Sequence, residues 1–234
     1  MNLLAFDTST ERLCVALRAG DRLLRADEAG GPAASARLLP CIDELLAAAG
    51  IAHDALHAIG FGRGPGAFTG LRTSTAVAQG LAFGLGLPVL PLDSLLVVAE
   101  DARLQAGAEA GPFEVGVAMD ARMGEIYAAR YRWDGARWQV LEAPALHAAD
   151  ALRAAWSVGG PAGIAGSALG MAADPLGGLA GSTWPTERDR PAALMRVAVS
   201  AFANGEGVDA AAALPLYVRD KVALTTRERE QAAR

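Results

Sequence analysis

One order of short apolar runs and turns occurs twice in this chain of 234 residues. The first copy, NLLAFDTSTERLCVALRAGDRLLRAD, predicts a strand ending at Asp7, then a turn and two further strands. The second copy, VGVAMDARMGEIYAARYRWDGARWQV, repeats this order and has Asp120 in the place of Asp7. The copies share few identical residues, but the shared order exceeds what two unrelated hairpins would give. The chain is therefore predicted to consist of two related halves.

Each copy is followed by a helix, a strand and a further helix. The predicted helices and strands after the two copies are Ser35–Ala49, Ala58–Gly62 and Leu71–Leu85 in the first half, and Ala148–Trp156, Gly163–Ser167 and Pro191–Asn204 in the second. Strands that alternate with helices indicate an α/β protein. Two tandem βββαβα units are the layout of the actin, sugar-kinase and Hsp70 superfamily, in which a nucleotide lies between two domains. This is the predicted fold class.

Small and turn-forming residues mark the boundary between the halves. The segment QAGAEAGP, residues 105–112, predicts a linker after the first half. The closing segment LPLYVRDKVALTTRERE is expected to return to the first domain. The predicted domains are therefore residues 1–104 with 205–234, and residues 105–204.

Composition indicates a folded protein that does not bind nucleic acid unaided. Hydrophobic residues make up 52% and charged residues 20%, and the net charge is −5. Cys14 and Cys41 lack metal-binding or redox spacing and are expected to be reduced thiols. The N-terminus lacks the basic start of a signal peptide, and the apolar run LAFGLGLPVLPL is short and broken by Gly and Pro. A cytoplasmic protein with no membrane contact is expected.

Two segments could hold phosphate groups. The turn DTST follows the first strand, where this superfamily wraps a phosphate, but Asp, Ser and Thr are also ordinary turn formers. The stretch GRGPGAFTGLR matches neither the P-loop nor the dinucleotide fingerprint. The second turn, DARMGE, is a poor phosphate cradle. We therefore predict a vestigial phosphate site, whose candidate residues are Asp7, Thr8, Ser9, Thr10, Gly64 and Gly66.

The helix after the glycine-rich stretch is rich in small residues. It carries Ala76, Ala78, Gly80, Ala82 and Gly84. Glycine inside a helix costs about 1 kcal/mol relative to alanine, so a close packing partner is indicated. That partner is either another helix of this chain or a second subunit.

The motif HDALH, residues 53–57, resembles a zinc-binding pair of histidines. A helix ends at Gly50 and a strand begins at Ala58, so only about one helical turn is available, and His147 would have to supply the third ligand from the other half. No metal site is predicted.

Several blocks resemble one family closely. They are LLAFDTSTERLCVAL, SARLLPCIDELLAAAG, GFGRGPGAFTGLRTSTAVAQGLAFGLGLPV, MDARMGEIYAA and LPLYVRDKVA. They are similar, in the same order and over nearly the whole chain, to the TsaB family, also called YeaZ. This bacterial family is needed to make threonylcarbamoyladenosine in tRNA, and its paralogue TsaD carries the active site. Both were once labelled M22 glycoproteases.

The resemblance implies a non-catalytic subunit with no catalytic residue of its own. TsaD holds a metal through an H-x-x-x-H motif, and the matching positions here are Ser94 and Val98, which cannot be those ligands. It implies a homodimer when alone, a heterodimer with TsaD, and a ternary complex with the ATPase TsaE. tRNA would be contacted mainly through the partner. No cofactor is expected in the isolated chain, and ATP or ADP only in the complex.

The resemblance also implies that the first-domain helices bind the partner. The candidate contact residues are Leu38, Leu39, Ile42, Leu46, Thr75, Gln79 and Ala82. The family usually has HSERLLP where this chain has ASARLLP, so Ala34 stands in place of a histidine. Two alternatives remain open: an ATP-dependent small-molecule phosphotransferase of the sugar-kinase class, and an M22-type metallopeptidase.

Overall fold

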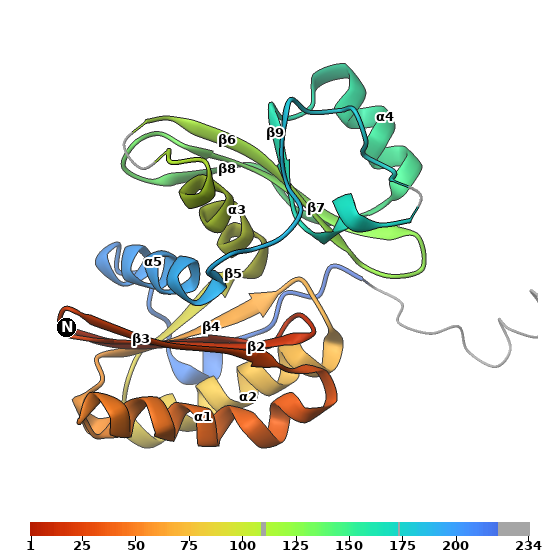
Figure 1. Ribbon diagram of the computed structural model, residues 1–234. Helices are drawn as coiled ribbons and strands as arrows, with labels where there is room; N and C mark the ends of the chain where they lie inside the picture. The colour runs from red at the N-terminus through yellow and green to blue at the C-terminus, as the bar shows by residue number, and fades with distance from the viewer. Residues whose placement is uncertain (109–110, 173, 220–234) are drawn as a thin grey trace, which may run out of the picture.

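The computed structural model describes residues 1–108, 111–172 and 174–219 and contains two halves, each built on a five-stranded sheet (Figure 1). The strand orders are β3-β2-β1-β4-β5 and β10-β9-β6-β7-β8. In both sheets the first three strands of the half run antiparallel, and the last two run parallel to the first. The two sheets therefore have the same topology. The predicted α/β fold with two tandem halves is confirmed.

The first sheet is buried on both faces. Its strands are β1 (Asn2–Asp7), β2 (Arg12–Ala19), β3 (Arg22–Ala29), β4 (Ala58–Gly64) and β5 (Val89–Asp93). In β1, the side chains from Leu3 to Phe6 are all inaccessible to solvent, because helices cover both faces. The edge strand β3 carries exposed side chains along most of its length. The apolar runs that predicted β1, β2 and β4 are thus the interior of the first half.

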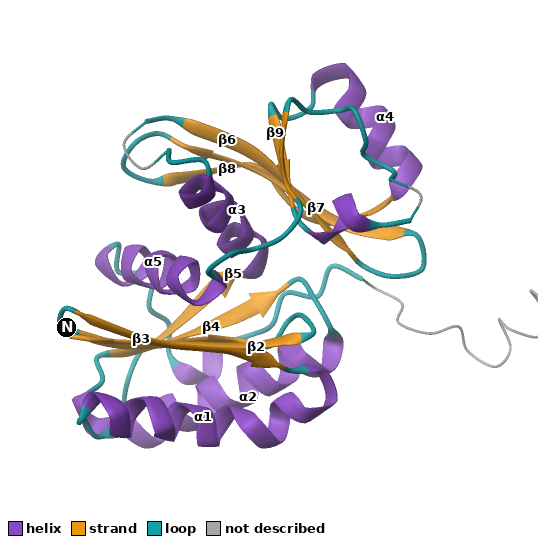
Figure 2. Cartoon of the chain, viewed as in Figure 1, coloured by secondary structure: helices purple, strands orange, loops and turns teal. Residues whose placement is uncertain are grey.

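Helices α1 (Ala34–Ala49) and α2 (Phe68–Leu85) lie together on one face of this sheet, as Figure 2 shows. Each ends at a glycine in the left-handed conformation, Gly50 at φ 72° and Gly86 at φ 66°. Their inward side chains pack against β1, β2 and β4 in one apolar cluster. Both predicted helices are confirmed, and α2 begins three residues earlier than predicted.

Helices α3 (Ser94–Gln105) and α5 (Arg190–Ala203) lie between the two sheets (Figure 1). Each packs on the sheet of the other half. Leu194 and Ala198 of α5 pack with Leu3 of the first sheet, whereas Leu95 of α3 packs with Val115 of the second. The halves thus exchange helices along their shared boundary. The proposed division into residues 1–104 with 205–234 and residues 105–204 stays a prediction, because packing crosses it at both helices.

Among the described residues of the second half, no helix corresponds to α2. Its elements are β6 (Phe113–Asp120), β7 (Glu125–Trp133), β8 (Trp138–Ala148), α4 (Ala149–Gly159), β9 (Gly163–Ala165) and β10 (Ser182–Trp184). After β9 the chain forms a short 3₁₀ turn at Ser167–Gly170. The helix predicted at Pro191–Asn204 is α5, which follows β10 as α3 follows β5. The helix was predicted to within one residue at each end, and the second half is βββαβα-like, as predicted.

Part of two predicted segments lies outside the described residues. The linker predicted at 105–112 includes residues 109–110, and the closing segment continues past residue 219. The described part of the closing segment follows a 3₁₀ turn at Ala210–Ala212 and runs beside α2. None of the helices in the described ranges is long and apolar enough to cross a membrane.

Candidate functional site

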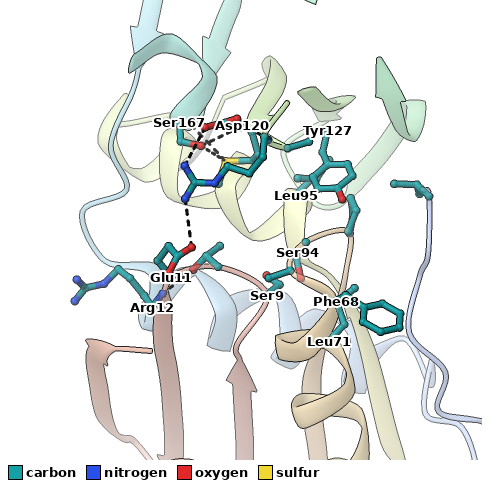
Figure 3. Close-up of a pocket in the computed structure, with 18 of the residues that line it drawn as sticks. Ser9, Glu11, Arg12, Phe68, Leu71, Ser94, Leu95, Asp120, Tyr127 and Ser167 are labelled. Atoms are coloured by element: carbon teal, nitrogen blue, oxygen red, sulfur yellow. Dashed lines mark hydrogen bonds and ion pairs between the residues drawn. The ribbon is translucent and has the colours of Figure 1, made fainter. Parts of the chain in front are cut away.

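A cavity of about 740 Å³ opens between the two halves (Figure 3). Ser9 to Arg12 of the turn between β1 and β2 line one side, and Met119 to Arg122, at the end of β6 and in the turn that follows, line the other. The glycine-rich loop, the start of α3 and the last described segment complete the wall. This is the place between the halves where the fold class predicts a ligand cleft.

The glycine-rich loop lies directly against the DTST turn. A Cβ atom at Gly66 would lie 2.3 Å from the carbonyl oxygen of Ser9, and one at Gly70 would lie 1.8 Å from that of Thr8. The amide of Ala67 donates a hydrogen bond of 2.7 Å to the Ser9 carbonyl. Only glycine permits so close an approach. The glycines of this loop therefore fit it to the first turn.

Most polar groups of the DTST turn are already bound within the chain. The amide of Thr8 donates to Ser74 Oγ at 3.2 Å, and its hydroxyl donates to the Gly70 carbonyl at 2.7 Å. The amide of Ser9 donates to Asp7 Oδ1 at 2.7 Å. Ser9 Oγ is buried and has no partner among the described residues. A phosphate at this turn would have to displace bonds that the fold itself uses.

Asp7 does not face the cavity. Its carboxylate is inaccessible and accepts a hydrogen bond of 2.8 Å from the guanidinium of Arg190, at the start of α5. Burial raises the pKa of Asp7, but the charge of Arg190 and the hydrogen bond from the Ser9 amide outweigh it and hold the pKa below 3.8. Arg190 also pairs with Glu187 at 2.5 Å. The Asp7 carboxylate is therefore part of a buried ion pair and is not presented to a ligand in the cavity.

The arginines that line the cavity each have a carboxylate partner. The pairs are Arg12 with Asp27 at 2.5 Å, Arg122 with Glu11 at 3.3 Å and with Asp120 at 3.5 Å, Arg190 with Glu187 at 2.5 Å, and Arg219 with Glu125 at 2.6 Å. Phosphate binding by arginine depends on charge that is not already neutralised. Among the described residues, each arginine that lines the cavity therefore has a carboxylate within ion-pair distance, and the Arg122 pairs are the longest.

The second turn is not a phosphate cradle. Arg122, Met123 and Gly124 have φ values of 66°, 58° and 75°, and the Met123 side chain is 87% exposed. Asp120 Oδ1 accepts the amide of Arg122 at 2.7 Å. Residues 120–124 thus form a tight turn, and their amides do not converge on a shared point where a phosphate could bind.

Four of the residues predicted to bind a partner are buried in the core. Leu38, Ile42, Leu46 and Ala82 are at most 3% exposed and pack against the first sheet, so the prediction that they form a contact face is wrong. These four side chains lie on the inward face of α1 and α2. A fifth candidate, Thr75, is also buried, and its hydroxyl donates a hydrogen bond to the Leu71 carbonyl of the same helix.

The outward face of α1 and α2 carries exposed apolar side chains and glycines. Leu39 is 44% exposed and Phe83 is 86% exposed. A Cβ atom at Gly80 or Gly84 would meet nothing within 4 Å, so no helix among the described residues packs there. Gln79 is half-buried and donates to the Ala213 carbonyl at 2.9 Å. The close partner that the small residues indicated is not found on this face within the described chain.

The histidines do not form a metal site. His53 lies 3.2 Å from Asp43, and His57 Nδ1 accepts the amide of Asn2 at 3.1 Å. His147 lies on β8 in the other half. Across residues 1–108, 111–172 and 174–219, no three His, Cys, Asp or Glu side chains are grouped to hold a metal. Of the positions matching the TsaD metal motif, Ser94 Oγ accepts the Gly64 amide at 3.1 Å and Val98 is in the core.

Three important residues were not predicted from the sequence. Arg190, Arg219 and Tyr217 each contact an element far away in the chain. For Arg190, the neighbouring residues mark the start of a helix, because Asp189 caps α5 and Pro191 occupies its first turn. They do not show which distant residue the arginine contacts.

These features define a class of protein: an α/β protein of the actin and sugar-kinase type in which the chain's own groups fill the first phosphate turn. A family model described as "TsaD: tRNA N6-adenosine threonylcarbamoyltransferase" matches residues 31–173. The tRNA threonylcarbamoyladenosine biosynthesis protein TsaB of Escherichia coli is 31% identical over 231 residues, which is 95% of this chain and 96% of that protein. The chain belongs to the TsaB family.

Other relatives agree with this assignment. The TsaB protein of Haemophilus influenzae is 44% identical over 127 residues, but the match spans only 54% of this chain and 52% of that protein. Among solved structures, YeaZ from Pseudomonas aeruginosa is 38% identical, with a TM-score of 0.81, 92% of this chain covered and 99% of that one. A second structure from that organism, described as similar to peptidase YEAZ, has a TM-score of 0.82 at 37% identity, covering 93% of this chain and 99% of that one.

Proposed function

We propose that this chain is a non-catalytic subunit that binds and activates a TsaD-type transferase, which forms threonylcarbamoyladenosine beside the anticodon of tRNA. The relatives named for this biosynthesis support the pathway. The paired charges of the cavity and the buried Asp7 support a role without phosphoryl transfer. Serine and valine at the metal-motif positions support a role without metal chemistry.

The observation that carries the proposal is the outward face of α2. Ala76, Gly80 and Gly84 are spaced four residues apart, so they lie on one side of the helix. All three are exposed, and both glycines have open space above them. Phe83 and Leu39 add exposed apolar side chains to the same pair of helices. A second helix could approach α2 closely here and bury this surface.

The occupant of this face is a TsaD-type protein in the working complex and a second copy of this chain when it is alone. Both arrangements use a related surface, because the two proteins share a fold family. TsaE joins the heterodimer, and ATP or ADP is held only in that assembly. The acidic net charge of −5 suits a subunit whose partner makes most of the tRNA contacts in the cytoplasm.

Replacing Gly80 with leucine tests the proposal. The new side chain points into open space, and leucine is the better helix former, so the variant monomer should melt at the same temperature as the parent monomer or higher. The variant should fail to co-elute with the TsaD-type partner and should lose most tRNA modification in a reconstituted mixture. Ala155→Leu, on the exposed side of α4, is the matched control and should keep both. Full activity of Gly80→Leu would remove this face from the proposal.

A further inference from the structure

The last described residues, 214–219, run from α2 to the turn between β6 and β7. At their start, the Ala213 carbonyl accepts a hydrogen bond of 2.9 Å from Gln79 of α2. The amide of Leu216 then donates to the Arg63 carbonyl of β4 at 2.7 Å. Leu216 to Arg219 line the cavity between the halves. This segment is therefore one wall of the cavity.

Tyr217 attaches the segment to the first turn of α2. Its ring centre lies 5.4 Å from that of Phe68, within the range of a favourable aromatic pair. The Arg72 guanidinium lies 4.0 Å from the centre of the same Phe68 ring. These contacts belong to the first half.

Arg219 attaches the segment to the second half. Its Nη2 donates to Glu125 Oε2 at 2.6 Å and to the Ala121 carbonyl at 2.9 Å. The Arg219 side chain is 18% exposed, so its ion pair is partly shielded from solvent. The other tie across the cavity, Arg122 with Glu11, is 70% and 76% exposed and contributes little.

The halves are fixed to each other on the side of α3 and α5. Tyr131 of β7 donates to Asp93 Oδ2, at the start of α3, at 2.7 Å. Asp101 of α3 accepts the amides of Arg188 and Asp189, ahead of α5. Helices α3 and α5 therefore form a firm joint. On the cavity side, the described contacts between the halves include the two hydrogen bonds of Arg219 and the exposed pair of Arg122 with Glu11.

We propose that residues 214–219 form a strap that holds the two halves closed over the cavity, with Tyr217 as its anchor and Arg219 as its latch. Release of the latch lets the halves rotate about α3 and α5 and opens the cavity. This inference does not depend on the proposed partner, because it concerns the isolated chain.

The test is the distance between spin labels on the two halves, at Ala47→Cys of α1 and Ala155→Cys of α4, measured by electron double resonance. Both positions are exposed, and the native Cys14 and Cys41 are at most 1% exposed, so they should not react. Labelling the parent chain checks this. Arg219→Gln should lengthen and broaden the distances, whereas Arg137→Gln, whose side chain is 75% exposed in the β7–β8 turn, should leave them unchanged.

Two further measurements separate the strap from a general loss of structure. Tyr217→Ala should lengthen the distances as Arg219→Gln does, and Tyr217→Phe, which keeps the ring, should behave as the parent. Raising the salt concentration from about 0.1 to 1 M shortens the Debye length from about 10 to 3 Å and weakens the Arg219–Glu125 ion pair. The distances in the parent should therefore shift towards those of Arg219→Gln. The distances in Arg219→Gln itself should not change with salt, because its ion pair is already absent. Parent-like distances in both Arg219→Gln and Tyr217→Ala would overturn the proposal.

Discussion

The guanidinium of Arg190 lies 2.8 Å from the carboxylate of Asp7, a residue 183 positions earlier in the chain. Arg190 and Asp7 side chains are 4% and 0% exposed. The pair joins the end of the central strand β1 to the first turn of α5. It therefore ties together two elements that the sequence order assigns to different halves, and it withdraws Asp7 from the cavity.

Removing the arginine should destabilise the fold strongly. Arg190→Met leaves the buried Asp7 carboxylate without its cation, a change that costs about 3–5 kcal/mol in comparable buried pairs. Urea unfolding should show this loss, and Asp7→Asn in the same chain should recover part of it. Arg137→Met removes an exposed pair and should cost less than about 1 kcal/mol. An equal loss of unfolding free energy in Arg190→Met and Arg137→Met would contradict a stabilising role for the buried Arg190–Asp7 pair.

The Arg190–Asp7 pair should make the free energy of unfolding depend on pH in the acid range. The pKa of Asp7 is lower in the folded chain than its ordinary value of 3.8, so the unfolded chain takes up the proton first as pH falls. The stabilisation is therefore present above pH 3.8 and is lost as pH falls through the folded pKa. The gap in unfolding free energy between the parent and Asp7→Asn should shrink over that range. A gap independent of pH would show that the carboxylate charge contributes nothing.

Local patterns predicted the elements well. The helical period over Ser35–Ala49 matches α1 to within a residue, and the repeated strand order matches both sheets. Such patterns depend on neighbouring residues, which the sequence presents directly. The helix α5 was also predicted, but the sheet on which it packs was not, because its apolar residues fit a helix on either sheet and only packing across the chain decides between them.

The site was predicted in position but not in its contacts. The DTST turn and the DARMGE turn do face each other across a cavity, as the duplicated order indicated. Leu38 and Ile42 show the limit of an apolar period, because it does not distinguish a face that packs on the chain's own sheet from one that packs on a partner. Gly80 and Gly84 of α2 give the proposed partner face stronger support, since they lower helix propensity and have open space above them.

Two glycines of α2 should respond to alanine with opposite signs. Gly70→Ala places a Cβ atom 1.8 Å from the Thr8 carbonyl, so the glycine-rich loop must move away from the first turn. Overpacking of this kind costs about 1–3 kcal/mol. Gly80→Ala meets open space and should gain about 0.5–1 kcal/mol from helix propensity. Thermal and urea unfolding check both, and a neutral Gly70→Ala would refute the close contact.

The isolated chain should not bind Mg-ATP at micromolar concentrations. The amides of Thr8 and Ser9 are already bonded within the chain, and Arg12 and Arg122 are paired with carboxylates. Calorimetric titration should therefore give no saturable heat, and incubation with Mg-ATP should release no phosphate. Under the proposed function, the complex with the TsaD-type partner and TsaE should bind nucleotide, so it serves as the comparison. Micromolar binding with turnover by the isolated chain would instead favour the phosphotransferase alternative, because the internal bonds of the first turn would then have to open to admit a nucleotide.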